Sequence, residues 1–182
     1  MPRVLAHTLD DAPEQTRPTL EALKKRMGKL LNIHAGMAHS PVVLAAYAGV
    51  QEAITRHGSF DGRTREAIAL AVGAVDRCGY CQSAHTLGGK ADGLEPDQML
   101  AIRAGHPTGE DKLDTLLAVM REAAADVGTV QDSTWEQAKA AGWSDEELAE
   151  AFAHLVVNLF TNYFNHYVGT ELDVPAAPAL GG

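Results

Sequence analysis

The chain has 182 residues, only two of them cysteines, and carries a formal net charge of −9 at pH 7. A core of the size this length allows is stable without a disulfide or a metal, so both cysteines are free for chemistry. The acidic excess argues against nucleic-acid binding, which needs Lys and Arg gathered on one face. The sequence shows neither the basic start and apolar run of a signal peptide nor a membrane-spanning stretch. We therefore expect a cytoplasmic protein with no membrane or nucleic-acid partner.

Helices are predicted throughout the chain, and no strand. Apolar residues recur every three or four positions, and aromatic residues make up only 5% of the sequence. Capping residues, prolines at first helical positions and closing glycines divide the chain into about seven helices. They are expected at residues 16–32, 40–58, 64–77, 78–93, 95–105, 109–128 and 144–168.

The second and third helices carry clear boundary signals. The second begins with Ser40 and Pro41 and ends at Gly58, where a left-handed residue is expected. The third is capped by Thr64 or Asp61, and its content of Ala, Val and Leu predicts burial nearly all round. We therefore expect the third helix to lie at the centre of the molecule.

The domain organisation follows from the two ends of the helical region. The last and longest helix begins with a capping box formed by Ser144 and Glu147. Residues 1–15 precede the core as an N-terminal arm, and residues 169–182 follow it as a loose tail. Because the connections are short and no repeat or linker is present, the sequence predicts one all-α domain over residues 1–182, with a helical core at 16–168.

The only two cysteines begin the fourth helix, in the stretch "CGYCQSAH". Cys78, Cys81 and His85 are three and four residues apart, so on a helix they share one face. A thiol at a helix N-terminus is favoured as the thiolate, which is the nucleophilic form. A second cysteine one turn away can attack a sulfenic acid formed on the first and give a disulfide. The spacing therefore predicts a dithiol and disulfide cycle.

An acidic residue is expected beside these thiols. Glu66 lies twelve positions before Cys78, in a helix that otherwise reads as buried. A break near Asp76 and Arg77 folds that helix back beside the cysteine helix. Glu66 can then accept a proton from a thiol or from water, with His85 as a second member of the relay.

Simpler interpretations of the same residues remain open. The two cysteines can be small buried hydrophobes, and together with His85 and Glu66 or water they can also form a zinc site. His85 alone can be a structural histidine bonded to a backbone carbonyl, and Glu66 alone a solvated residue in a first helical turn. As functions, a lyase or isomerase that uses Glu66 and His85 as acid and base, and a non-enzymatic redox sensor, stand beside a peroxidase.

The spacing of Glu66, Cys78, Cys81 and His85 resembles the signature of the alkylhydroperoxidase D group within the carboxymuconolactone decarboxylase-like family. The flanking stretches "DGRTREAIALAVGA" and "NYFNHYVGTELDVPA" also resemble the peroxidase-related branch of that family. The resemblance covers most of residues 20–175. It implies an all-helical subunit that assembles as a homo-oligomer, a trimer or a hexamer, and that reduces peroxides without a bound cofactor.

The resemblance also implies roles for the four residues. Cys81 would be the peroxidatic thiol, Cys78 the resolving thiol, and Glu66 with His85 the proton relay. A thiol reductant, either a lipoyl protein or a thioredoxin-like partner, would recharge the disulfide. The better-known members carry a histidine between the cysteines, where this chain has Tyr80. The founding decarboxylase members lack the cysteine pair, so decarboxylation is not the activity expected.

Two further groups of residues complete the expectations. The stretch "NYFNHYV", with Asn162, Asn165 and His166 among two tyrosines, is expected to form a subunit interface, and a role of His166 in the site is the weaker alternative. A second group is expected to line a pocket or to pack in the core. Its members are His34, His39, Leu44, Tyr47, Leu70 and Leu87.

Overall fold

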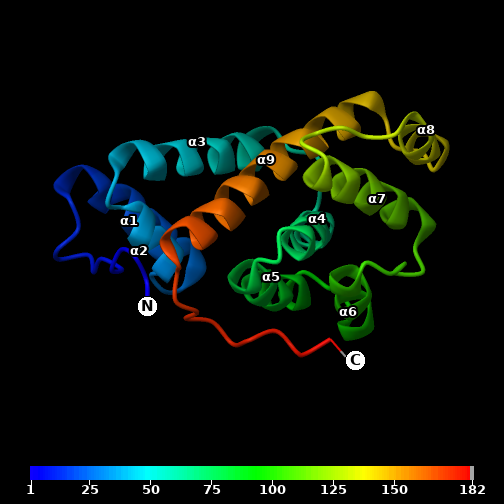
Figure 1. The fold of residues 1–182 in the computed structure, drawn as a ribbon. Coiled ribbons are helices and arrows are strands. Elements are labelled where there is room, and N and C mark those ends of the chain that lie inside the picture. Colours follow the sequence, from blue (N-terminus) through cyan, green and yellow to red (C-terminus); the bar gives the residue numbers. More distant parts are fainter. Residues whose placement is uncertain (181–182) are drawn as a thin grey trace.

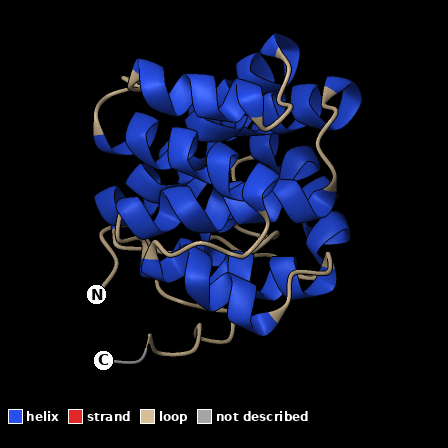
Figure 2. Ribbon diagram, turned by 90° about the vertical axis from the view of Figure 1, so that its right-hand side faces the viewer, coloured by secondary structure: helices blue, strands red, loops and turns tan. Residues whose placement is uncertain are grey.

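The computed structural model describes residues 1–180, and every regular element within them is helical (Figure 2). The all-α fold predicted from the sequence is therefore confirmed. A short 3-10 helix, Glu14–Thr16, precedes nine α-helices in this part of the chain. They are α1 (Arg17–Met27), α2 (Asn32–Met37), α3 (Pro41–His57), α4 (Gly62–Val75), α5 (Gly79–Ala91), α6 (Pro96–Ala104), α7 (Asp111–Ala125), α8 (Asp132–Ala140) and α9 (Asp145–Val168).

Two short helices account for the difference from the expected seven. The N-cap residues of α2 and α8 are Leu31 and Gln131, which are not favoured N-cap types, so no start signal marks these helices in the sequence. The predicted first helix also ends early, because Gly28 adopts a φ of 76° and stops α1 at Met27. Gly58 ends α3 as predicted, but with a φ of −70° rather than a left-handed one. A Cβ there would lie 2.5 Å from the carbonyl oxygen of Ile54.

Helix α4 lies at the centre of the molecule, as its composition predicts. All seven of its residues from Ala67 to Gly73 are buried. It packs against α5, α6, α7 and α9, which surround it in Figure 1. The start of α4 is capped by Asp61, whose carboxylate accepts a hydrogen bond from the N–H of Thr64 at 2.8 Å. The predicted capping box of Ser144 and Glu147 at the start of α9 is also present.

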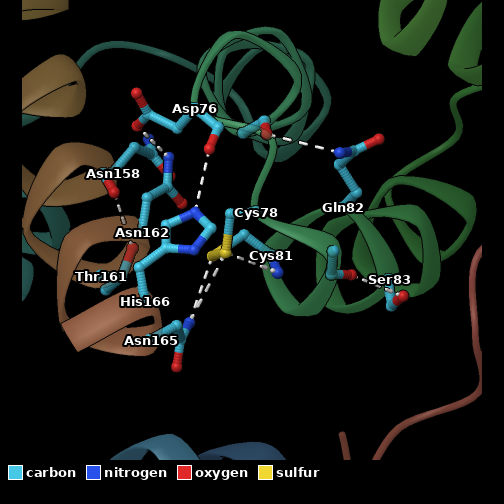
Figure 3. Close-up of a disulfide and its surroundings, with 12 residues drawn as sticks. Asp76, Cys78, Cys81, Gln82, Ser83, Asn158, Thr161, Asn162, Asn165 and His166 are labelled. Atoms are coloured by element: carbon cyan, nitrogen blue, oxygen red, sulfur yellow. Dashed lines mark hydrogen bonds between the residues drawn. A yellow bond between two sulfur atoms is a disulfide. The ribbon is translucent and has the colours of Figure 1, made fainter. Parts of the chain in front are cut away.

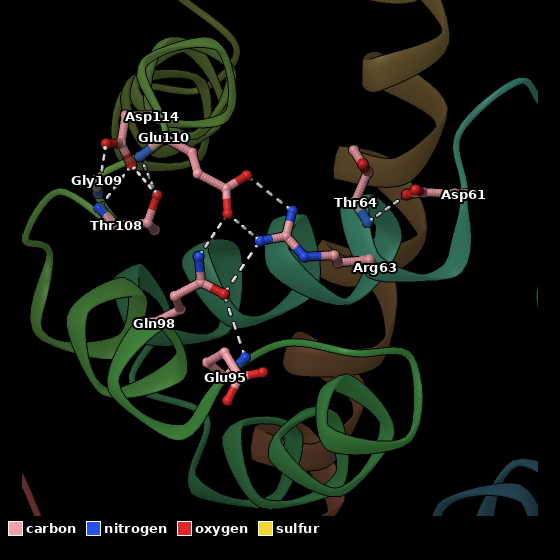
Figure 4. A network of polar contacts seen from close by, with 9 residues as sticks. All are labelled: Asp61, Arg63, Thr64, Glu95, Gln98, Thr108, Gly109, Glu110 and Asp114. Atoms are coloured by element: carbon pink, nitrogen blue, oxygen red, sulfur yellow. Dashed lines mark hydrogen bonds and ion pairs between the residues drawn. The ribbon is translucent and has the colours of Figure 1, made fainter.

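A polar network fixes the starts of three helices to one another (Figure 4). Arg63 on α4 donates to the carboxylate of Glu110, which precedes α7, and to Oε1 of Gln98 on α6. Gln98 in turn donates to Glu110 at 2.6 Å. The charge of Arg63 and these hydrogen bonds lower the pKa of Glu110. Because α6 and α7 are held in this way, α4 and α5 pack on a rigid support.

The apolar core has two parts, and the cysteines belong to the smaller one. The larger cluster joins α4, α6, α7 and α9 around residues such as Ile68 and Leu116. The smaller cluster joins α1, α2 and α3 to the first turn of α5, and it includes Cys78, Tyr80 and Cys81. The first turn of α5 therefore packs against the N-terminal helices, while the rest of α5 packs against α4.

The C-terminal segment is fastened to the core rather than loose as predicted. Asp173 accepts hydrogen bonds from the hydroxyl of Tyr80 at 2.7 Å and from the N–H of Asn32 at 3.2 Å. Further along, the N–H of Ala177 donates to Oγ of Ser83. Figure 1 shows the segment running past α5 towards α6. Residues 181–182 of the predicted tail lie outside the described residues.

No helix within residues 1–180 combines the length and the hydrophobicity needed to cross a membrane.

Candidate active site

The two cysteines form a disulfide at the start of α5 (Figure 3). Cys78 is the N-cap residue of α5, and its Sγ accepts a hydrogen bond from the N–H of Cys81 at 3.2 Å. Their Cα atoms are 5.3 Å apart, and both side chains are buried. The free N–H groups and the positive end of the helix dipole meet at this turn, so negative charge on a sulfur is stabilised there.

A tight turn returns the chain from α4 to α5. Arg77 adopts a φ of 54°, in the left-handed region that residues other than glycine rarely occupy. The N–H of Cys78 then donates to the carbonyl oxygen of Gly73 at 2.9 Å and closes the end of α4. Helix α5 therefore runs back beside α4, and the break expected near Asp76 and Arg77 is present.

His85, in the second turn of α5, pairs with Glu66 on α4. Its Nδ1 lies 2.9 Å from Oε2 of the Glu66 carboxylate. Burial of the imidazole opposes protonation, but the charge of Glu66 and the hydrogen bond to it outweigh burial and raise the pKa of His85 above 6.5. The pair leaves Nε2 of His85 free of Glu66, so this nitrogen is available to other groups.

A glycine makes room for this pair. A Cβ at Gly88 would lie 2.5 Å from Oε2 of Glu66, so a larger residue would displace the carboxylate. Gly89 lets α5 approach Leu94, because a Cβ there would lie 2.9 Å from Cδ1 of that leucine. The two glycines that weaken α5 as a helix are thus needed for its packing.

Cys81 and His85 line the same cavity, which has a volume of about 90 Å³. Its walls come from α1, α2, α3, α5 and α9, and Cys78 is not among the lining residues. A second cavity of about 210 Å³ adjoins it and shares His85 and Tyr47 with the first. Glu66 lines this second cavity. The two cavities thus have one of the sulfurs in the first, the Glu66 carboxylate in the second and the His85 imidazole in both.

A buried histidine faces the dithiol across the small cavity. Nε2 of His34 on α2 lies 3.2 Å from the hydroxyl of Tyr47 on α3, and its Nδ1 is buried without a partner. Burial and the charge of Arg26 lower the pKa of His34 to about 4. His34 is therefore neutral at physiological pH, and with Tyr47 it contributes polar atoms to the wall of the cavity that Cys81 also lines. Of the other residues expected to line a pocket, Leu44 and Leu70 lie in the core and Leu87 is exposed.

Tyr80 lies between the cysteines in the sequence, and its hydroxyl is engaged by the C-terminal segment. Its hydroxyl donates to Asp173, and burial together with that carboxylate raises its pKa well above the usual value. Tyr80 therefore keeps its proton and anchors the C-terminal segment.

Helix α9 places side chains beside the cysteine turn, and of these only His166 was given a role in the site, as an alternative, from the sequence. Nδ2 of Asn165 lies 3.2 Å from Sγ of Cys81 and 3.9 Å from Sγ of Cys78. Asn162 donates to the carboxylate of Asp76 at 2.7 Å, and His166 bonds the backbone carbonyl of Asp76. These three residues face the cysteine turn (Figure 3), as the alternative expectation for His166 requires, and the subunit interface expected for this stretch stays a prediction. Tyr163 and Tyr167 on the same stretch are exposed.

The spacing of α9 contained a signal for this face. Asn158, Asn162 and Asn165 are four and three residues apart, so they fall on one side of a helix. A row of amides in an otherwise apolar helix indicates a polar partner inside the protein. That signal does not say which partner, because the side of α9 that faces α5 is set by packing.

The four predicted site residues form two pairs around the cavities. Cys78 pairs with Cys81, and Glu66 pairs with His85. Among residues 1–180, no three His, Cys, Asp or Glu side chains come together as a metal site requires. Fold and site together define an all-helical protein with a CxxC pair at a helix start and a carboxylate-bound histidine beside it.

The comparisons with known proteins agree with this class. Residues 41–122, from α3 into α7, match the model of the Carboxymuconolactone decarboxylase family. This segment is similar to that family, and over these residues the resemblance predicted from the sequence is confirmed. No curated protein matches the chain.

Solved structures share the fold over nearly the whole chain. An alkylhydroperoxidase AhpD core protein from Ralstonia eutropha JMP134, described as an uncharacterized peroxidase-related protein, has a TM-score of 0.82 at 18% identity over 94% of this chain and 92% of its own. A peroxidase-related protein from Silicibacter sp. TM1040 has a TM-score of 0.78 at 16% identity over 97% and 96%. The debrominase Bmp8, solved as a cysteine-to-alanine variant with 2,3,4-tribromopyrrole, has a TM-score of 0.79 at 17% identity over 93% and 91%.

Proposed function

We propose that the protein is a thiol-dependent peroxidase that reduces organic hydroperoxides or hydrogen peroxide through the Cys78 and Cys81 pair. One observation carries the proposal: Cys81 lines a cavity together with His85, and Glu66 holds that histidine. The family match and the shared fold of peroxidase-related proteins support it. Cys81 is the peroxidatic residue in this proposal because Cys78 does not line the cavity.

In the first step the thiolate of Cys81 attacks the terminal oxygen of the hydroperoxide. A sulfur–oxygen bond forms, the oxygen–oxygen bond breaks, and the alkoxide leaves. His85 gives the alkoxide a proton, so the products are an alcohol and a sulfenic acid on Cys81. The raised pKa of His85 suits it to carry that proton near neutral pH.

In the second step Cys78 attacks the sulfenic acid. The disulfide forms as the sulfur–oxygen bond breaks, and the departing hydroxide takes up a proton to become water. That proton is the one that Cys78 gives up, passed through the histidine and carboxylate pair. His85 regains its own proton when reduction of the disulfide returns Cys81 as a thiol, which ionises again. A Cα separation of 5.3 Å is within the range that a disulfide spans without backbone movement.

A thiol reductant returns the disulfide to the dithiol and supplies the two electrons that the peroxide consumes. We propose a lipoyl protein or a thioredoxin-like protein for this role. Attack on the sulfur of Cys81 is the accessible route, because that sulfur borders the cavity.

We further propose that the subunit is a homo-oligomer, a trimer or a hexamer. Helix α9 carries an exposed apolar row at helical spacing, formed by Phe152, Val156, Tyr163 and Tyr167. Such a row marks a surface that a partner covers. Light scattering on the purified protein tests this, and a monomer at micromolar concentration would contradict it.

The peroxidase proposal is tested with purified protein, cumene hydroperoxide and hydrogen peroxide, with dihydrolipoamide as reductant. We expect hydroperoxide-dependent turnover, its loss in Cys81→Ser, and a trapped sulfenic acid in Cys78→Ser, which intact mass spectrometry detects as one added oxygen atom. Cys78→Ser is the matched control, because it keeps the first step and removes the second. Failure of the wild-type protein to consume either peroxide or to cycle its disulfide would refute the proposal.

A second candidate is reductive debromination, favoured by the shared fold of Bmp8. A dithiol supplies the electrons for this reaction, in which a carbon–bromine bond is replaced by carbon–hydrogen, and bromide and a disulfide are the other products. Release of bromide from a brominated pyrrole, without peroxide consumption, would favour it. Activity on a carbonyl acid that survives Cys78→Ala and Cys81→Ala would instead favour a lyase or isomerase.

A further inference from the structure

Asn165 on α9 is the one side chain within residues 1–180 that donates a hydrogen bond to the sulfurs of the dithiol. Its Nδ2 lies 3.2 Å from Sγ of Cys81 and 3.9 Å from Sγ of Cys78 (Figure 3). The only other donor to a sulfur is the backbone N–H of Cys81, which bonds Sγ of Cys78. The side chain of Asn165 is 5% exposed, so water does not compete for its amide.

The amide of Asn165 is poorly satisfied in the disulfide state. Its Oδ1 is buried and has no hydrogen-bond partner among the described residues. Its Nδ2 faces sulfurs that accept hydrogen bonds only weakly while they are neutral. A buried amide in this condition costs free energy that an apolar residue of similar size would not. Asn165 is therefore not expected to stabilise the fold of the oxidised protein.

Reduction of the disulfide strengthens the hydrogen bond from Asn165 to Cys81. A thiolate carries a full negative charge, and a hydrogen bond to an ionised acceptor is about twice as strong as one between neutral groups. The same N–H therefore stabilises the reduced site more than the oxidised one. Because the shorter contact is to Cys81, the sulfur that borders the cavity, the gain falls on the proposed nucleophile.

We propose that Asn165 is a further catalytic residue, which holds Cys81 as the thiolate and favours the dithiol over the disulfide. This inference rests on the proposed function, in which Cys81 attacks the substrate. The start of α5 supplies one part of the stabilisation from the backbone, and Asn165 supplies the other from the facing helix.

Titratable groups surround the sulfurs, but none has a hydrogen bond to them. On α2, α3 and α5 they are His34, Tyr47, Tyr80 and His85, which line the cavity with Cys81. At the end of α4 and on α9 they are Asp76 and His166, which are bonded to α9 and to the turn respectively. An effect of Asn165 on the thiol is therefore separable from the ionisation of these groups.

The inference is tested in a Cys78→Ser background, where Cys81 is the only thiol. The absorbance of the thiolate is followed as a function of pH, with and without Asn165→Ala or Asn165→Val. The two variants remove the same donor and leave different volumes, so agreement between them separates the amide from packing. We expect both to raise the thiol pKa by about one unit, since a bond to a charged group is lost. The rate of reaction with cumene hydroperoxide at neutral pH then falls about tenfold.

With both cysteines present, the same substitutions shift the equilibrium with dithiothreitol about tenfold towards the disulfide. That shift corresponds to a reduction potential about 30 mV more negative. Asn162→Ala is the matched control, because Asn162 lies on the same helix, is also buried and bonds Asp76 instead of sulfur. It is expected to lower the free energy of unfolding and to leave the thiol pKa unchanged.

The outcomes distinguish this inference from the proposed activity. Thiolate titrations of Asn165→Ala and Asn165→Val that coincide with that of their parent would overturn it, whatever the peroxidase activity. If the parent consumes no hydroperoxide and both variants still raise the thiol pKa, the peroxidase proposal fails and the role of Asn165 at the thiolate stands.

Discussion

The structure contains two glutamate and histidine pairs that differ in the proton affinity of the histidine, and both histidines line the larger of the two cavities. Glu66 and His85 join α4 to α5 at 2.9 Å, and Glu150 and His154 lie one turn apart on α9 at 3.2 Å. The pKa of His85 is raised, whereas the pKa of His154 is lowered. The same two residue types thus give one histidine with a raised proton affinity and one with a lowered proton affinity.

The difference comes from how each carboxylate is shared. Glu150 accepts hydrogen bonds from the N–H and the hydroxyl of Ser59 and from the N–H of Phe60, so its charge is already used. Burial of His154 therefore dominates, and the charge of Arg65 lowers the pKa of this histidine further. For Glu66, His85 is the only hydrogen-bond donor among the described residues. The unshared carboxylate of Glu66 suits the proposed proton relay, whereas the shared carboxylate of Glu150 fastens the loop before α4 to α9.

Removing the charge of Glu66 should have the largest effect on the difference between the two pairs. Glu66→Gln keeps the shape of the side chain and removes the charge that raises the pKa of His85. We expect peroxide turnover at neutral pH to fall about a hundredfold, the size of effect typical of a lost acid–base catalyst. The measurement is steady-state turnover with cumene hydroperoxide, and unchanged turnover would remove Glu66 from the relay.

Glu150→Gln is the matched substitution and is expected to act on stability instead. The neutral amide loses the charge-assisted bonds to Ser59 and Phe60, which lowers the free energy of unfolding by about 1–3 kcal/mol. Turnover of the folded protein should stay within about twofold of the wild type. Urea unfolding followed by circular dichroism measures the first effect. A large loss of turnover without a loss of stability would show that the second pair is also part of the relay.

The contact between Glu66 and His85 can also be disrupted by a substitution at a neighbouring residue. In Gly88→Ala the new Cβ meets the carboxylate of Glu66, which has to move, because it is the end of a flexible side chain. We expect about a tenfold loss of turnover and a lower pKa of His85, with the fold retained, since alanine is the better helix former. Gly49→Ala is the control on α3, where a Cβ has nothing within 4 Å. It should raise the free energy of unfolding by about 0.5–1 kcal/mol and leave turnover unchanged. Equal turnover in the two variants would contradict the prediction.

The sequence predicts features that depend on residues a few positions apart. It does not predict the difference between the two glutamate and histidine pairs, which depends on contacts between distant segments. The start of α9 at Ser144, the cap of α4 at Asp61 and the helical setting of Cys78 and Cys81 depend on residues a few positions apart. Their physics is a hydrogen bond or a helix repeat within one turn, so the pattern alone is sufficient.

What the sequence could not predict depends on contacts between distant segments. Asn165 is 84 residues from Cys81, and its orientation follows from how α9 packs on the cysteine turn. The C-terminal segment has no helical pattern, and its attachment depends on Asp173 meeting Tyr80. Likewise, Glu150 and His154 show helical spacing in the sequence, but only the loop at Ser59 decides that their charge is shared. Short helices such as α2 lack the length over which a periodic pattern becomes readable.

The smallest expected effect needs no substitution, because the two histidines should titrate on opposite sides of pH 6.5 in the oxidised wild-type protein. By NMR, the imidazole signals of His85 should move above that pH and those of His154 below it. The two histidines therefore make the free energy of unfolding depend on pH in opposite directions. His85 stabilises the fold fully below pH 6.5, and this contribution is lost as the pH rises through its folded pKa. His154 stays neutral in the folded state while the unfolded chain takes up a proton, so stability falls as the pH drops below 6.5. If both histidines titrated at the same pH, the hydrogen bonds from Ser59 and Phe60 to Glu150 would have no effect on the pKa of His154. The two pairs would then differ only in where they lie in the structure.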